Sequence, residues 1–333
     1  MRYSGIGGQA VMEGVMMKNK DTYAVAVRKA DGEIEVKTDK YEGIVKSEVW
    51  NKIPLVRGVV NFIDSLVLGI STLMYSATFF EEEEEEKPKK KGKSGQTGEA
   101  ADADASAGGG ADSGEKSDKL FVAGTLTLSL VLAVAIFLLL PYGLSVVFQK
   151  FISNATVIAV IEGVLRLAIF IIYVVLISQM EDIKRTFMYH GAEHKCINCI
   201  EHGLDLNVEN VRKSSKEHKR CGTSFLMFVV VISIIAFLFI RVDSHVLKIV
   251  IRLLLIPVIA GISYELLRAA GRSDGKVINL ISRPGLWLQH LTTSEPDDSM
   301  IEVGIASVEA VFDWRSYVAG IRESEGEEPL QKS

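Results

Sequence analysis

The segment Leu120–Val147 reads LFVAGTLTLSLVLAVAIFLLLPYGLSVV, 28 residues without a charged side chain. An α-helix needs roughly 20 apolar residues to cross a hydrocarbon core about 30 Å thick. Three further apolar stretches are predicted to span in the same way: Val157–Ser178, Ser224–Ile240 and Val246–Leu267. Inside lipid a helix satisfies its own backbone hydrogen bonds. The sequence therefore predicts a bundle of four transmembrane helices.

The overall composition supports a membrane protein and excludes several other classes. Of the 333 residues, 48% are hydrophobic, and the mean hydropathy is +0.24, which argues against a purely soluble enzyme. The net charge is −5 and the basic clusters are short, so we expect no nucleic-acid partner. All three cysteines lie between positions 196 and 221, which fits a reducing compartment better than a secreted disulfide framework. Residues 1–20 lack the pattern of a cleaved signal peptide.

Lysine and arginine are concentrated on one side of the predicted spans. Four polar regions hold between seven and ten each: residues 1–57, 87–119, 180–223 and 268–333. The two short connections between spans hold only Lys150 and the pair Arg241 and Lys248. Because cytoplasmic loops are enriched in these residues, we expect a multi-pass plasma-membrane protein in contact with membrane lipid. Both termini and the loop 179–223 are predicted to be cytoplasmic.

The segment Pro54–Phe80 is long and apolar, yet it carries Arg57, Asn61 and Asp64 on successive turns of one helical face. This amphipathic spacing favours a helix that lies on the membrane or packs against the bundle. The alternative is a fifth span, which would place residues 1–53 outside the cell.

The two ends of the chain are predicted to form a small cytoplasmic α/β part, which makes the whole an α+β membrane protein. Residues 22–38 alternate apolar and polar side chains around Asp31 and Gly32, as in a β-hairpin. Residues 299–307 alternate in the same way and are predicted to add a strand to that hairpin. Residues 81–119 combine a run of glutamates, a basic patch and a Gly/Ala/Asp/Ser run, which predicts a disordered linker.

Four of the six histidines and all three cysteines lie in the segment Tyr189–Phe225. On a continuous helix, His190 and His194 stand at i and i+4 on one face, a spacing that can chelate one metal ion. Glu193 lies between them in the sequence, and His218 and Cys221 form a second close pair before the next predicted span. The segment is the candidate functional site.

Two metal-binding interpretations use different residues of this segment. In the first, His190, Glu193 and His194 form an H-x-x-E-H motif, in which the histidines bind zinc and the glutamate is the general base. Its third ligand is one of four candidates: Glu201, His218, Cys221 or Glu265. In the second, Cys196 and Cys199 join His218 and Cys221 in a closed structural zinc site. An ordinary polar loop is the alternative to both.

Four motifs resemble the YqhQ-like family, a bacterial membrane family of unknown function sometimes labelled a predicted metal-dependent enzyme. They occur in order along nearly the whole chain: GIGGQAVMEGVMMK from Gly5, YHGAEHK from Tyr189, HKRCGTSF from His218, and PGLWLQHLTTSEPDDSMIEVGIAS from Pro284. The family pattern falls on six positions here: His190, Glu193, His194, Glu201, His218 and Cys221. Cys196 and Cys199 depart from it, which weakens the four-residue Cys/His interpretation.

We therefore expect a zinc site of His190, His194, His218 and Cys221, with Glu193 or Glu201 beside the ligands or acting as a base. No motif for a substrate pocket accompanies it. The favoured function is a non-enzymatic membrane or assembly factor that contacts other membrane proteins, and the alternative is a membrane-bound, zinc-dependent hydrolase. Elsewhere, Glu13 is the N-terminal residue expected to reach a site, and Glu162 and Arg166 are expected to pair with each other or with a neighbouring helix. Trp287 is expected to be a packing residue and not a catalytic one.

Overall fold

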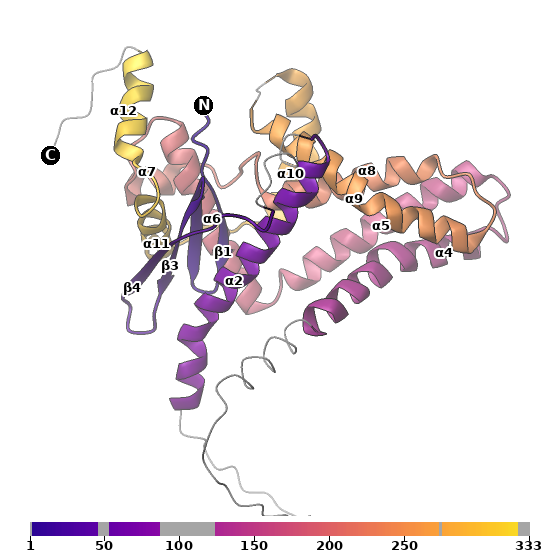
Figure 1. The fold of residues 1–333 in the computed structure, drawn as a ribbon, viewed down its shortest axis with the longest axis horizontal. Coiled ribbons are helices and arrows are strands. Elements are labelled where there is room, and N and C mark those ends of the chain that lie inside the picture. The colour runs from indigo at the N-terminus through magenta and orange to yellow at the C-terminus, as the bar shows by residue number, and fades with distance from the viewer. Residues whose placement is uncertain (1, 46–52, 87–123, 273–274, 326–333) are drawn as a thin grey trace, which may run out of the picture. The chain divides into compact units, whose positions relative to one another are not determined.

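The computed structural model describes residues 2–45, 53–86, 124–272 and 275–325. These parts of the chain are mostly helical, with one four-stranded antiparallel sheet (Figure 1). The chain divides into two compact units, one made of Met1–Glu82 with Phe170–Ser333 and the other of Glu83–Ile169. Most of the predicted disordered linker lies outside the described residues.

The sheet is built entirely from the N-terminal region, in the order β1 (Gly7–Val11), β2 (Gly14–Asn19), β3 (Thr22–Arg28) and β4 (Ile34–Lys40). The predicted hairpin over residues 22–38 is confirmed, because β3 pairs with β4 in a register that places Ala26 opposite Val36. Its loop is longer than a two-residue turn, since the pairing ends at Arg28 and Ile34.

The motif that begins at Gly5 forms a second hairpin. Val11 pairs with Gly14, so Met12 and Glu13 make a two-residue connection in which Glu13 has a φ of 47°. That left-handed conformation is uncommon for a residue with a side chain. Gly14 is required here because a Cβ at this position would lie 2.3 Å from the carbonyl oxygen of Ala26.

The prediction of a strand over residues 299–307 is wrong, because they belong to helix α11 (Asp298–Glu309). The side chain of Asp297 accepts a hydrogen bond from the backbone of Met300 and caps this helix. The two ends of the chain do pack together, but as a helix on a sheet. Arg28 of β3 forms an ion pair with Glu302 at 2.8 Å, and the hydroxyl of Ser307 donates to the carbonyl of Ala24.

The other helices of this unit follow in chain order. Their bounds are α2 (Val56–Glu86), α6 (Glu181–Glu201), α7 (Val208–Lys213), α8 (Gly222–Leu238), α9 (His245–Ala270), α10 (Lys276–Thr292) and α12 (Trp314–Glu325). Helix α5 (Ala155–Ile177) precedes α6 but does not continue into it, because Met180 is extended with a ψ of 134°. The histidines at 190 and 194 nevertheless share one helix, as the sequence predicted.

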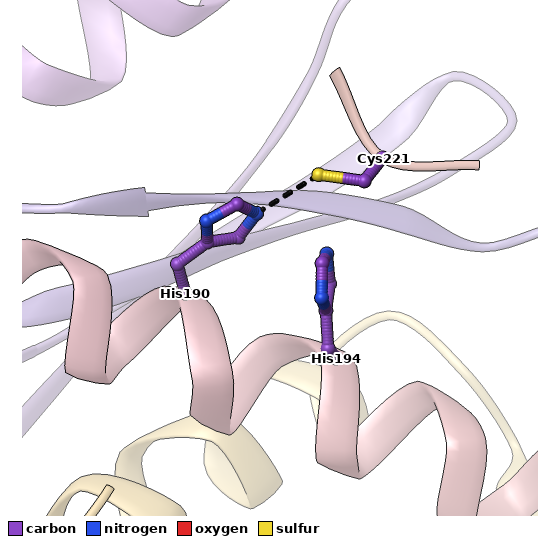
Figure 2. Close-up of side chains that lie close together, drawn as sticks. All are labelled: His190, His194 and Cys221. Atoms are coloured by element: carbon purple, nitrogen blue, oxygen red, sulfur yellow. Dashed lines mark hydrogen bonds between the residues drawn. The ribbon is translucent and has the colours of Figure 1, made fainter. Parts of the chain in front are cut away.

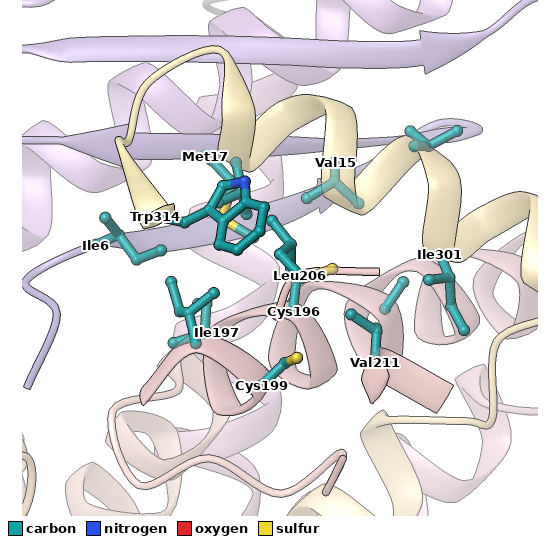
Figure 3. Packing of buried hydrophobic residues seen from close by; sticks show 14 of the residues in the cluster. Ile6, Val15, Met17, Cys196, Ile197, Cys199, Leu206, Val211, Ile301 and Trp314 are labelled. Carbon is teal, nitrogen blue, oxygen red and sulfur yellow. The ribbon is translucent and has the colours of Figure 1, made fainter. Parts of the chain in front are cut away.

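Helices cover both faces of the sheet, and alternate strand residues serve the two layers. Val15, Met17 and Ala26 belong to a core shared with α6 and α11, together with Ile197 and Ile301 (Figure 3). The intervening side chains face α2, where a second core is formed by Val11, Met16, Val25, Val27 and Leu68. Helix α6, which carries the two histidines, is thus held against a rigid sheet.

Four helices are long and apolar enough to cross a membrane, judged by length and composition: Val56–Phe80, Gly124–Phe148, Ala155–Ile177 and His245–Ala270. Three of them match predicted spans, and the first is the segment whose role the sequence left open. The predicted span at 224–240 corresponds to α8, an apolar helix of 17 residues at the lower limit of a spanning length.

The second unit contains the helix 124–148 and the beginning of α5. The first of these includes a π-helical turn, η1 (Ala135–Leu139), followed by α4 (Leu140–Phe148). As predicted, Arg166 and Glu162 form a buried ion pair at 2.7 Å. Arg166 also donates to the carbonyl oxygen of Phe137 in the π-helical turn.

Candidate metal site

Helix α6 and the start of α8 bring together three side chains that can ligate a metal. The rings of His190 and His194 lie one helical turn apart, with centroids separated by 4.4 Å. Cys221 is the N-cap residue of α8 and faces both rings (Figure 2). One potential ligand atom from each residue lies within 4.8 Å of the other two.

Backbone carbonyl groups hold both imidazole rings in the orientation that ligation requires. The Nδ1 atom of His190 lies 2.9 Å from the carbonyl oxygen of Thr292, and that of His194 lies 2.6 Å from the carbonyl oxygen of Lys216. A carbonyl oxygen only accepts hydrogen bonds, so each Nδ1 must carry the proton. In the neutral ring each Nε2 then keeps its lone pair, which is the arrangement found in metal-ligating histidines.

The electrostatics of the group favour a thiolate at Cys221. Burial alone would raise the pKa of its thiol, but the neighbouring His190 and His194 lower that pKa well below its usual value. Conversely, burial would lower the pKa of His190, but the sulfur of Cys221, 3.1 Å from Nε2, raises that pKa to about 9. The thiolate is the form of cysteine that binds metals.

Glu193 lies beside this group and is only 5% exposed. The backbone of β1 approaches its carboxyl group closely, since a Cβ on Gly8 would lie 3.0 Å from Glu193 Cδ. One carboxyl oxygen, Oε2, is buried and has no hydrogen-bond partner among the described residues. Burial raises the pKa of Glu193.

His218, the fourth predicted ligand, is buried close to this group but is not part of it. Gln289 accepts a hydrogen bond from the His218 backbone N–H and donates one to its carbonyl, both at 2.8 Å. With its backbone fixed in this way, His218 places Nε2 3.6 Å from Oε2 of Glu201. Glu201 therefore also lies apart from the three potential ligands, in an ion pair with Arg220.

The closed site of two cysteine pairs is not formed. Cys196 and Cys199 are buried in the hydrophobic core shared by α6, the sheet and α11 (Figure 3). Cys199 donates toward the carbonyl oxygen of Asp205 at 3.4 Å. Burial raises the pKa of Cys196 far above its usual value, so its thiol stays protonated and is a poor ligand.

Two other predicted participants have different partners. Glu265, considered as a third ligand, instead accepts two hydrogen bonds from the guanidinium group of Arg57. Glu13 pairs with Arg185 and accepts from the hydroxyl of Tyr189, the residue before His190. It therefore reaches the start of the motif but does not enter the group of ligands.

The sequence did not reveal the parts of the site that come from the backbone. The carbonyl groups of Lys216 and Thr292 are contributions that any residue type can make. The close approach of β1 needs a glycine at position 8, where a Cβ would lie 2.5 Å from the carbonyl oxygen of Met16. The glycine-rich motif from Gly5 contains this residue, but the sequence does not show which side chain lies beside it. Trp287, expected to be a packing residue, is 51% exposed.

The donor set fits zinc in its chemistry. Two imidazole nitrogens and one thiolate sulfur are ligands that Zn²⁺ prefers, and three protein ligands leave one position of a tetrahedral shell. Carboxylate-rich sites for Mg²⁺ or Ca²⁺ have a different composition.

The fold and the site together define a helical protein with candidate membrane spans and a buried His/Cys group beside a small antiparallel sheet. The chain belongs to the family described as "Protein of unknown function (DUF1385)", whose model matches residues 53–314. It is 35% identical over 306 residues to "Uncharacterized protein YqhQ" of Bacillus subtilis (strain 168), which covers 90% of both chains. The predicted family resemblance is thereby confirmed. No solved structure matches the chain.

Proposed function

We propose that this protein is a membrane factor that binds one Zn²⁺ ion through His190, His194 and Cys221. The observation that carries the proposal is the convergence of two Nε2 atoms and one Sγ atom, with each Nδ1 held by a backbone carbonyl. This arrangement directs three polar side chains toward one point inside the protein. Because burying polar groups is costly, ordinary packing does not produce it.

In this proposal the role of the ion is architectural. His190 and Cys221 lie 31 positions apart in the sequence and belong to α6 and α8. The carbonyl of Thr292 at the end of α10 is joined to the same group through His190. A bound ion would therefore fasten the loop before α8 to the sheet-bound helix α6. The non-enzymatic function that follows is assembly with other membrane proteins in the plasma membrane, with this part on the cytoplasmic side.

Metal analysis of the detergent-purified full chain tests the proposal. We expect about one zinc ion per chain by inductively coupled plasma mass spectrometry, and loss of the zinc in the double variant His190→Ala, His194→Ala. The matched control is His290→Ala, because His290 is an exposed histidine paired with Glu217 outside the site. Equal zinc content in the double variant and the wild type would contradict the proposal. A wild-type protein that retains no transition metal after it has been incubated with zinc would contradict it as well.

A second candidate function, a zinc-dependent hydrolase, is favoured by Glu193. Its Oε2 atom is buried next to the ligands without a hydrogen-bond partner among the described residues, and only three protein ligands are present. Zinc, when bound, supplies a water of lowered pKa. Glu193 would accept the proton of that water at Oε2, as the glutamate does in H-x-x-E-H sites.

Cobalt substitution separates the two functions without a known substrate. Co²⁺ in this site is expected to show the charge-transfer band of a thiolate ligand, which Cys221→Ser removes. In the hydrolase, azide should alter the visible cobalt spectrum by occupying the position that the three protein ligands leave open, whereas an architectural site, in which a fourth protein ligand closes that position when the ion binds, should not respond. Glu193→Gln should keep the cobalt band in both cases, and it abolishes the protein's cellular role only in the hydrolase.

A further inference from the structure

Helix α2 has the length and composition of a membrane span. It buries small and polar residues and exposes large apolar ones, which is the reverse of a helix in a soluble protein. Its fully buried residues are small or polar, with one exception at Leu68: Gly58, Gly69, Thr72 and Ser76. Its exposed large apolar residues are Ile63, Leu66, Val67, Leu73 and Met74, each at least 40% exposed, and three small polar residues, Ser65, Ser71 and Thr78, are exposed as well. At 100° per residue the buried residues and the exposed large apolar residues lie on opposite sides of the helix.

The buried face of α2 makes polar contacts with the sheet along much of the helix. The side chain of Gln9 in β1 donates to the carbonyl of Gly69, and the hydroxyl of Ser76 accepts from the backbone of Met12 at 3.1 Å. Lys37 of β4 lies over the ring of Tyr75, 4.6 Å from its centre. These contacts join the second half of α2 to a sheet with charged residues.

This sheet could not enter a bilayer with α2. Strand β4 reads IEVKTDK, and its four charged residues are all exposed: Glu35, Lys37, Asp39 and Lys40. A charged side chain at the centre of a bilayer costs about 2.5–3.5 kcal/mol on insertion scales. If α2 crossed the membrane, its contacts with β1 and β4 would draw several such charges into hydrocarbon.

The first turns of α2 are tied to the end of a candidate span. Arg57 forms an ion pair with Glu265 in the last turns of α9, and a Cβ on Gly58 would lie 3.0 Å from Gly261. Further along, Phe62 packs on Phe225 at the beginning of α8, with ring centres 4.9 Å apart. Helices α8 and α9 run side by side as a hairpin, so these contacts lie at one end of it (Figure 1).

We propose that α2 does not cross the membrane but lies in the lipid interface, with its apolar face in the bilayer surface and its polar face on the sheet. It starts where α9 and α8 meet that surface and carries the sheet beneath it. Such a helix buries its apolar face about 5–10 Å into the headgroup and acyl boundary. The regions before and after α2 then lie on the same side of the membrane.

Spin labels in the full-length protein, reconstituted in lipid bilayers, test the depth of the exposed face. Single substitutions Ile63→Cys, Val67→Cys and Met74→Cys place labels on that face over 11 positions, about 16 Å of helix. The three native cysteines are buried. Lys37→Cys is the aqueous control, and Leu130→Cys, in the apolar helix 124–148, is the deep control.

We expect the three α2 labels to collide with oxygen more often than the Lys37 label and to share one shallow depth, above that of the Leu130 label. A depth that changes by more than about 10 Å between positions 63 and 74 would show a span and overturn the proposal. If the α2 labels collide with a water-soluble nickel complex as often as the Lys37 label does, the face is exposed to solvent. If they are protected from both oxygen and the nickel complex, the face is covered by a protein partner. Either result also overturns the proposal.

The side of the membrane on which the residues before and after α2 lie provides an independent measurement, because it needs no spin label on α2. Glu35→Cys precedes the helix and Ser94→Cys follows it in the sequence. A membrane-impermeant maleimide should label both variants in the same vesicle orientation, inside-out or right-side-out, and neither in the other. Labelling of the two variants in opposite orientations would establish that α2 crosses the bilayer.

Discussion

Helix α6 buries two groups of polar side chains that differ in how completely they are paired. At its C-terminal end, Oε1 of Glu201 accepts from the backbone N–H and hydroxyl of Ser4, at 2.9 and 2.6 Å, and pairs with Arg220, while Oε2 lies 3.6 Å from Nε2 of His218 without a hydrogen bond among the described residues. Two turns earlier, Glu193 has a buried oxygen without a partner among the described residues, next to His190 and His194. Buried polar groups are costly unless satisfied. The two groups differ in that the charge of Glu201 is balanced by Arg220 within the protein, whereas Glu193 lies beside three side chains that can ligate a metal and has no such ion pair among the described residues.

The largest effect that separates the two groups is expected from Cys221→Ser. A hydroxyl is a much weaker zinc ligand than a thiolate, so zinc affinity should fall by more than about 100-fold, beyond the 10–100-fold typical of outer-sphere changes. Competition with a chromophoric chelator measures the dissociation constant. Cys199→Ser is the matched control and should retain wild-type affinity, because Cys199 lies in the core. Equal weakening in both variants would show that the loss reflects misfolding.

The next effect concerns the paired group and leaves the metal untouched. Burial opposes ionisation of Glu201, but His218, Arg220 and Ser4 together lower its pKa from 4.5 to about 2. That shift corresponds to about 3 kcal/mol of folding stability. We expect Glu201→Gln to lose roughly this amount in reversible denaturant unfolding in detergent while keeping its zinc. Loss of zinc at unchanged stability would reverse the roles assigned to the two groups.

The same carboxyl group predicts a dependence on acid. Because its pKa is lower in the folded state, its stabilisation is fully present above about pH 4.5 and disappears as the pH falls toward 2. The difference in unfolding free energy between wild type and Glu201→Gln should therefore shrink over this interval. Unfolding curves at several pH values in the same detergent measure it. A difference that stays constant down to pH 2 would contradict the lowered pKa.

The smallest effect is expected at Glu193, the carboxyl group without an ion pair among the described residues. Glu193→Gln keeps the shape of the side chain and breaks no ion pair seen among the described residues, so we expect stability to change by less than about 1 kcal/mol. Zinc content should remain at the wild-type level. A loss of 3 kcal/mol or more in thermal or denaturant unfolding would mean that Glu193 is as firmly paired in solution as Glu201.

The sequence predicted those parts of the fold whose residue pattern fits only one type of structure. Long apolar runs and the hairpin around Asp31 and Gly32 are of this kind. Residues 299–307 are ambiguous, because Ile301, Val303 and Ile305 alternate as in a strand. The structure buries a helical stripe instead, and Asp297 caps the helix. The stripe is formed by Met300, Ile301, Val303, Gly304, Ser307 and Val308. Nine residues are too few for periodicity to decide between the two.

The site was predictable where spacing along one helix places the side chains. His190 and His194 had to share a face of any helix through this segment, whereas the choice between Cys221 and His218 as a partner depended on the path of a loop. That path is fixed by Gln289, from a distant helix, whose side chain holds both backbone groups of His218. A single sequence contains no sign of that contact.

The two carbonyl oxygens that hold the imidazole rings have a consequence for how this site can evolve. Every residue type offers the same backbone acceptor, so substitutions at Lys216 and Thr292 can change the side chain without removing the hydrogen bonds to His194 and His190. The hydrogen bonds to the rings therefore place no requirement on the side chains at these two positions, and the ring orientation is inherited through the path of the chain. Insertions or deletions next to them, which shift the carbonyl groups, are the changes that natural selection should remove.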